Sequence, residues 1–126
     1  MRAYGDEMPI VIVTALPADV STVDRVLARL VADVAVASGC PLGDVWASYV
    51  PATAQHVGTR RAETGRQCPI VVIRGRARSN AAISAALAAA AHAVSAELGV
   101  SEDDVWLQWV DVMPGRAHAG GKPVGS

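Results

Sequence analysis

The feature that most constrains the fold is a repeat, because the second half of the chain restates the first half sixty residues later. The matched landmarks are Pro9 and Pro69, Gly39 and Gly99, Asp44 and Asp104, Trp46 and Trp106, and Val50 and Val110. Five pairs that keep one spacing without a gap are hard to obtain by chance. The sequence therefore predicts two copies of one structural unit.

The first copy has the pattern of a strand, a helix and a second strand. Residues 9–13 are a continuous apolar run, typical of a strand covered on both faces. Apolar residues then recur at helical spacing, with Ser21 or Thr22 as the expected N-cap. The helix is expected to end before Gly39, which suits the left-handed position after a helix. A second strand is predicted over residues 45–50.

The second copy repeats these elements. A strand is predicted over residues 70–73, a helix from about 79 to 98, and a strand over residues 105–110. Each β-α-β crossover should place its two strands parallel. The expected fold is therefore of the α/β (α+β) class, with a tandem β-α-β duplication that forms one four-stranded sheet with two helices on one face.

The chain is expected to form a single domain over residues 1–126, because 126 residues suffice for one buried core. The first unit covers about 9–58, a polar linker about 59–67, and the second unit about 68–121. With both helices on one side, the other face of the sheet remains apolar. Self-association through that face is expected.

Composition excludes several classes of protein. The chain is 52% hydrophobic, which argues against disorder, and its formal charge of −1 argues against nucleic acid or an anionic membrane as the main partner. No apolar stretch suggests a membrane span or a signal peptide. Cys40 and Cys68 fit a cytoplasmic protein, although a disulfide between them is an alternative. The scattered His and Cys residues match no metal site, and no cofactor is predicted.

An arginine cluster distinguishes the second copy from the first. Arg74, Arg76 and Arg78 follow the strand at the start of the helix, where the first copy has no arginine. A two-residue spacing on an extended segment would place these side chains on one side, and guanidinium groups bind carboxylates in bidentate fashion. The alternative is a solvated loop or ion pairs in a subunit contact.

The order of these motifs resembles the tautomerase superfamily. The resemblance lies in the Pro-Ile-Val strand starts, Arg78-Ser79 at the helix start, Gly after each helix, the Asp-Val-Trp that opens each second strand, and a Gly-rich tail. It extends from Pro9 to about Gly121. The two-unit length resembles the fused members, such as malonate semialdehyde decarboxylase and cis-3-chloroacrylic acid dehalogenase, more than the short 4-oxalocrotonate tautomerase. Because those fused members are trimers, the resemblance implies a homotrimer.

The resemblance also implies site residues. Pro9 matches the catalytic N-terminal proline, and Pro69 is its internal counterpart. Arg76 and Arg78 match a carboxylate-binding segment, to which Arg74 is adjacent, and Asp44 matches a water-orienting aspartate. His56 and His118 lie where the family closes its pocket. Trp46 and Trp106 take the place of a substrate-binding arginine, with core or subunit-interface packing as the alternative reading.

The main departure from the family is that eight residues precede Pro9. A proline nitrogen within a peptide bond has no proton and no basic lone pair, so Pro9 can act only if its amine is exposed, as it would be by a translation start at Met8 and removal of that methionine. Otherwise another group must act as the base, and the candidates are Asp44, His56 and the Met1 amine. Tyr4, Asp6 and Glu7 are further candidates for a replacement acid–base group or a plug over the pocket.

Two functional hypotheses follow. The first is an enzyme for a small keto or enol carboxylate. Enol–keto isomerisation is the preferred reaction, and decarboxylation or hydration is the runner-up. In a variant of this hypothesis the substrate is larger, and Trp46 lines a widened apolar pocket. The second is a non-catalytic trimer that binds an acidic metabolite or a partner.

Overall fold

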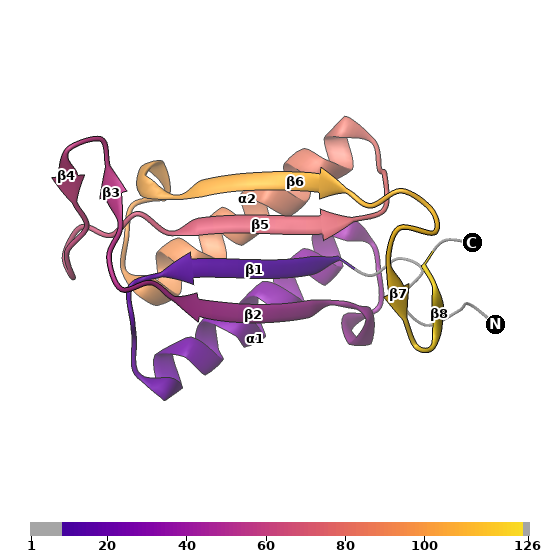
Figure 1. Cartoon of the computed structure of the whole chain (residues 1–126), viewed down its shortest axis with the longest axis horizontal. Helices are drawn as coiled ribbons and strands as arrows, with labels where there is room; N and C mark the ends of the chain where they lie inside the picture. The colour runs from indigo at the N-terminus through magenta and orange to yellow at the C-terminus, as the bar shows by residue number, and fades with distance from the viewer. Residues whose placement is uncertain (1–8, 125–126) are drawn as a thin grey trace.

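The computed structural model of the chain describes residues 9–124, and it confirms the predicted duplication and fold class. The first unit contains β1 (Ile10–Ala15), α1 (Val20–Ser38) and β2 (Trp46–Pro51), and the second contains β5 (Ile70–Gly75), α2 (Asn80–Leu98) and β6 (Trp106–Asp111). These strands form one sheet in the order β2-β1-β5-β6. The pairs β1–β2 and β5–β6 are parallel, whereas β1 and β5 are antiparallel at the centre. Both helices cover the same face (Figure 1).

Short elements that the sequence did not indicate complete each unit. Single 3-10 turns, η1 (Leu42–Asp44) and η2 (Glu102–Asp104), precede β2 and β6. Two small hairpins, β3 (His56–Val57) with β4 (Arg60–Arg61) and β7 (His118–Ala119) with β8 (Lys122–Pro123), lie at opposite ends of the sheet (Figure 1). The predicted linker and the Gly-rich tail are therefore more ordered than expected. Gly120 and Gly121 allow the second turn, because both have positive φ angles, 59° and 78°.

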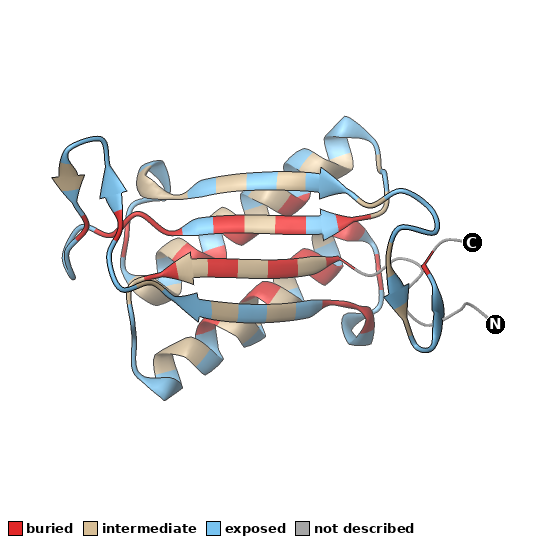
Figure 2. Ribbon diagram, viewed as in Figure 1, coloured by how far each residue is buried: buried red, intermediate tan, exposed pale blue. Residues whose placement is uncertain are grey.

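The core lies between the sheet and the helices. Buried residues alternate with more exposed ones along β1 and β5 (Figure 2), as expected for strands with one face on the core. The fully buried side chains of the core are Val11, Val13, Ala15, Val71 and Ile73 from the strands, and Val26, Leu30, Val34, Ala86, Ala90, Ala93 and Val94 from the helices. Alanines on α2 keep that helix close to its neighbours. The length and apolar composition of α2 would also suit a membrane span, a property that helices packed in protein cores share.

The helix ends are set by caps at equivalent positions. Gly39 and Gly99 have left-handed φ angles of 69° and 68°, as predicted, and Ser79 caps α2 through the backbone N–H of Ala82. The expectation of Ser21 or Thr22 as the first N-cap is wrong, because α1 begins earlier. Asp19 is the cap, since its carboxylate accepts hydrogen bonds from the backbone N–H of Thr22 and the hydroxyl of Ser21, both at 2.8 Å.

The Asp19 cap gives a pH-dependent stability prediction. The hydrogen bonds from Thr22 and Ser21 hold the pKa of Asp19 below its usual value of 3.8. The cap therefore stabilises the fold above pH 3.8, and this contribution is lost as the pH falls through the lower folded pKa. We expect Asp19→Ala to lower the Tm at neutral pH, and the deficit to shrink in acid. Equal deficits in thermal melts at about pH 7 and pH 3 would contradict this account.

The second face of the sheet is uncovered in a single chain. The residues that point to it are Ile10, Ile12, Thr14, Trp46, Ser48, Val50, Ile70, Val72, Arg74, Trp106, Gln108 and Val110; they are called the open face below. Trp46 and Trp106 are 48% and 63% exposed. The expectation that these two tryptophans pack in the core is therefore wrong. The alternatives that remain are contact with a partner subunit and contact with a ligand.

Candidate functional site

The duplication gives the sheet two ends that are equivalent by the sixty-residue offset. The Pro9 end is defined by Pro9, Gly75, Arg76, Arg78 and Trp109. The Pro69 end is defined by the cavity beside Pro69, described below. The antiparallel pairing of β1 with β5 places these ends on opposite sides of the molecule (Figure 1).

Pro9 is fully buried directly before β1. Its carbonyl accepts a hydrogen bond from the backbone N–H of Trp46 at 3.1 Å. Because Ile10 pairs with Arg74, Pro9 lies beside Gly75. A Cβ atom at Gly75 would stand 3.6 Å from the Cα of Pro9 and only 2.8 Å from Cζ2 of Trp109. Glycine is thus the residue that lets the β5 backbone pass between Pro9 and the indole ring.

The Trp109 indole is held in this position from two sides. Its Nε1–H donates to Oδ1 of Asp111 at 3.0 Å, and the guanidinium carbon of Arg78 lies 6.0 Å from the ring centroid. That separation is within the range of a cation–π contact. Sequence reasoning assigned no role to Trp109, although its distance of three residues from Trp106 places the two rings on opposite faces of a strand.

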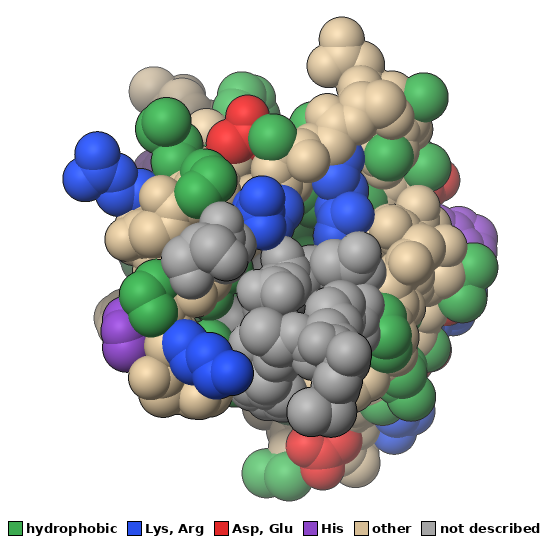
Figure 3. Space-filling model, turned by 90° about the vertical axis from the view of Figure 1, so that its right-hand side faces the viewer, with side chains coloured by type: hydrophobic (Ala, Val, Ile, Leu, Met, Phe, Trp, Pro, Cys, Tyr) green, Lys and Arg blue, Asp and Glu red, His purple; other side chains and the backbone are tan. Residues whose placement is uncertain are grey.

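The three predicted arginines do not share one side of the sheet. Arg74 is exposed within β5 and lies on the open face. Arg78 instead contacts Trp109, a residue that packs against the core on the helix side. The physical reason is that β5 extends to Gly75, so residues 74 and 78 belong to different local structures. Lys and Arg side chains gather on the Pro9 end of the molecule (Figure 3).

Asp44 and Trp46 also belong to the Pro9 end. Asp44 is buried in η1, two residues before the N–H that binds the carbonyl of Pro9. The structure thus places Pro9, Asp44, Trp46, Arg76 and Arg78 at the same end of the sheet, with Trp46 on the open face and Arg78 on the helix side. It places His56 and Trp106 at the Pro69 end instead, and His118 on the hairpin beside the Pro9 end. Tyr4, Asp6, Glu7 and the Met1 amine lie outside the described residues.

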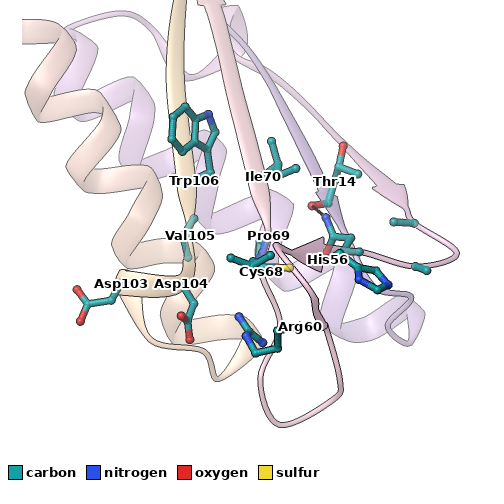
Figure 4. Close-up of a pocket in the computed structure, with 14 residues that line it drawn as sticks. Thr14, His56, Arg60, Cys68, Pro69, Ile70, Asp103, Asp104, Val105 and Trp106 are labelled. Atoms are coloured by element: carbon teal, nitrogen blue, oxygen red, sulfur yellow. Dashed lines mark hydrogen bonds between the residues drawn. The ribbon is translucent and has the colours of Figure 1, made fainter.

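The Pro69 end contains a cavity of about 720 Å³. Its walls come from the end of β1, the β3–β4 hairpin, the start of β5 and the η2–β6 segment (Figure 4). The polar side chains that line it are Thr14, Gln55, His56, Arg60, Asp103 and Asp104, together with the thiol of Cys68. Among the lining residues, the sequence indicated His56 and Trp106 as site candidates and Pro69 as the internal counterpart of Pro9.

Equivalent positions at the two ends carry different chemistry. Gly75 corresponds to Ala15, and Trp109 corresponds to Tyr49, whose hydroxyl donates to the carbonyl of Leu16 at 2.5 Å. Burial raises the pKa of Tyr49 above 10.0. Arg76 corresponds to Leu16. A compact tyrosine–carbonyl contact therefore stands where the other end has the indole and guanidinium groups.

Neither end has the composition of a metal centre. Within residues 9–124, no group of three His, Cys, Asp or Glu side chains is close enough to hold a metal ion. Cys40 and Cys68 are both buried and form no disulfide, because Cys40 follows α1 at the Pro9 end and Cys68 precedes β5 at the other.

Comparisons with solved structures identify the fold. Macrophage migration inhibitory factor from Toxoplasma gondii superposes with a TM-score of 0.79 at 18% identity, covering 90% of this chain and 98% of the other. R7, a fused 4-OT asymmetric trimer, gives 0.81 at 18% identity, covering 90% and 94%. Pt0534 inactivated by 2-oxo-3-pentynoate gives 0.79 at 17% identity, covering 92% and 95%. The chain has the fold of these proteins.

The sequence comparisons add no family assignment. No family model matches the sequence, and no curated protein matches it. At identities below 20%, the structural likeness establishes the fold alone.

Proposed function

We propose that this protein is a member of the tautomerase superfamily and an enzyme for a small keto or enol carboxylate, with enol–keto isomerisation as its reaction. The fold it shares with the fused 4-OT trimer and with Pt0534 supports this proposal. Pt0534 is inactivated by 2-oxo-3-pentynoate, a carboxylate with an adjacent ketone. Decarboxylation or hydration of a related substrate is the next candidate reaction.

The observation that carries the proposal is that Arg76 and Arg78 follow Gly75, the residue that lies beside Pro9. The β1–β5 register places Pro9 next to Gly75, and Arg76 follows directly. Arg78 is half-buried against Trp109. A carboxylate beside these residues would meet two guanidinium groups at a partly desolvated position, where charge-assisted hydrogen bonds are strong.

In the proposed reaction, the arginines orient the substrate and stabilise charge. Moving a proton between carbon and the enol oxygen needs a positioned base and a cation near the developing oxyanion. Arg76 and Arg78 supply the cation. The amine of Pro9 is the base if processing after Met8 exposes it. Asp44 is the alternative base at this end, because His56 lies at the other end of the subunit.

The mature N-terminus tests the role of Pro9. Intact-mass measurement of protein purified from its native host distinguishes a chain that starts at Pro9 from one that keeps residues 1–8. Phenylenolpyruvate and malonate semialdehyde then serve as assay substrates for isomerisation and decarboxylation. Turnover by a chain that begins at Pro9 supports the amine as base. Turnover by a chain that keeps the extension excludes the Pro9 amine, and Asp44→Asn in that chain then separates Asp44 from the candidate groups of residues 1–8.

The second candidate is a non-catalytic trimer that binds an acidic metabolite. It is favoured by the peptide-bonded nitrogen of Pro9 in the full sequence, which cannot accept a proton. An extended mature chain that binds these carboxylates through Arg76 and Arg78 without turning them over would establish this function in place of catalysis.

We also propose a homotrimer assembled through the open face, by analogy with the R7 trimer. Gel filtration should give a mass about three times the 13.0 kDa of the chain. Val72→Glu places a charge at the centre of the open face and should shift the protein to a smaller species. Val36→Glu on the exposed surface of α1 is the matched control. Elution of the wild-type protein as a monomer would contradict the proposal.

A further inference from the structure

We propose that the cavity at the Pro69 end is a second ligand site, for an α-amino acid with an apolar side chain. Its volume of about 720 Å³ is ample for such a ligand and falls within the usual range for small-molecule sites. The cavity shares no lining residue with the Pro9 end as defined above. The inference is therefore independent of the function proposed for Pro9, Arg76 and Arg78.

Opposite charges on the cavity wall define the ligand class. Asp104, at the end of η2, and Arg60, on the β3–β4 hairpin, extend into the same region below Cys68 and Pro69 (Figure 4). They form no ion pair with each other, and the Asp104 carboxylate has no hydrogen-bond or ion-pair partner among residues 9–124. A ligand that carries an ammonium and a carboxylate group would complement both residues.

Arg60 is positioned for this role by the loop that follows it. Its Nη1 donates to the carbonyl oxygen of Arg66 at 3.0 Å, which ties the guanidinium to the turn bridged by Glu63 and Arg66. The other guanidinium donors stay available for a bidentate contact with a carboxylate. The backbone of Asp104 is also held in place, because its N–H donates to the carbonyl of Ser101, the residue that caps η2.

Gln55 is a buried polar residue of the cavity wall. The residue is only 9% exposed, and it lines the cavity. Its Nε2 donates to the carbonyl of Thr14 at 3.3 Å, an acceptor that fixes the orientation of the amide. Its Oε1 is enclosed and has no hydrogen-bond donor among residues 9–124. Gln55 therefore closes the wall of the cavity and is not assigned a ligand contact.

Trp106 provides the apolar wall. The residue is 63% exposed in the single chain and borders the cavity two residues after Asp104, at the start of the edge strand β6 and thus at the margin of the open face (Figure 4). Ala52, Ala54 and Ile70 extend this apolar lining. An apolar ligand side chain that covers the indole would remove hydrophobic area of both partners from water.

Three matched probes test the proposal on the full-length protein by isothermal titration calorimetry. Phenylalanine carries both charges, phenethylamine carries only the ammonium, and 3-phenylpropionate carries only the carboxylate. We expect phenylalanine to bind about tenfold more tightly than either single-charge probe, the size of one charge-assisted hydrogen bond. Equal or tighter binding of a single-charge probe would overturn the assignment.

Variants locate the binding. Asp104→Asn should reduce phenylalanine affinity about tenfold and leave the affinity for 3-phenylpropionate unchanged. Arg60→Gln should also reduce phenylalanine affinity about tenfold, but should leave the affinity for phenethylamine unchanged. Asp24→Asn, an exposed α1 position outside the cavity, is the matched control. Thermal melts report whether each variant stays folded. Unchanged phenylalanine affinity in a folded Asp104→Asn protein, or no phenylalanine binding to the wild type, would refute this site.

Discussion

Replacement of both Arg76 and Arg78 by alanine is expected to lower kcat/KM for the carboxylate substrate by about 100-fold or more. Each guanidinium group contributes hydrogen bonds to a charged partner, and such bonds are worth about 1.5–3 kcal/mol. Loss of two of them therefore corresponds to at least two factors of ten. Steady-state kinetics with phenylenolpyruvate and malonate semialdehyde measure the effect.

The division of the loss between KM and kcat separates two roles for the arginines. If they hold only the carboxylate, the loss lies in KM, because substrate and transition state benefit equally. If one of them faces the developing oxyanion, kcat falls as well. The half-buried Arg78 is held beside Trp109, so it is expected to dominate the kcat component.

Arg61→Ala is the matched control for this experiment. Arg61 is exposed on β4, far from the Pro9 end, and it does not line the cavity. The variant loses the same charge without loss of either proposed contact, so its kinetics should match those of the wild type. Equal turnover by the wild type and the Arg76→Ala/Arg78→Ala protein would refute the arginine role, whatever the mature N-terminus proves to be.

The sequence predicted the architecture well because the determinants of each element are local. Apolar periodicity located both helices and all four long strands, and glycine at positions 39 and 99 located the helix ends. The N-cap at Asp19 was missed because Ser21 and Thr22 are equally good caps in isolation. The structure shows that the helix begins at Val20, which makes Asp19 the cap.

The site was harder to predict because it depends on register and side-chain direction. Gly75 and Trp109 are thirty-four residues apart, and they meet only because β5 and β6 pair in parallel with Gly75 beside Asp111. Two-residue strands such as β3 and β4 have no periodicity to detect. The cavity beside Pro69 depends on that hairpin, so its charged lining could not be read from spacing.

Gly75→Ala is expected to destabilise the protein by about 1–3 kcal/mol, the cost of overpacking. An alanine at a glycine with an unstrained backbone ordinarily stabilises a protein slightly, by about 0.4–1 kcal/mol. Here the added methyl group would lie 2.8 Å from Cζ2 and 3.0 Å from Cη2 of Trp109. The indole cannot move away without loss of its hydrogen bond to Asp111 or its contact with Arg78. Chemical denaturation measures the change.

Gly65→Ala and a second substitution make this prediction specific. A Cβ at Gly65 has no neighbour within 4 Å, so the Gly65→Ala protein should unfold within about 0.5 kcal/mol of the wild type. Trp109→Leu removes the ring atoms that obstruct the methyl group. In that background Gly75→Ala should lose most of its cost, a coupling of about 1 kcal/mol or more between the two positions. Additive effects would mean that Gly75 is required for a reason other than the indole, and the packing assigned to the Pro9 end would then be incorrect.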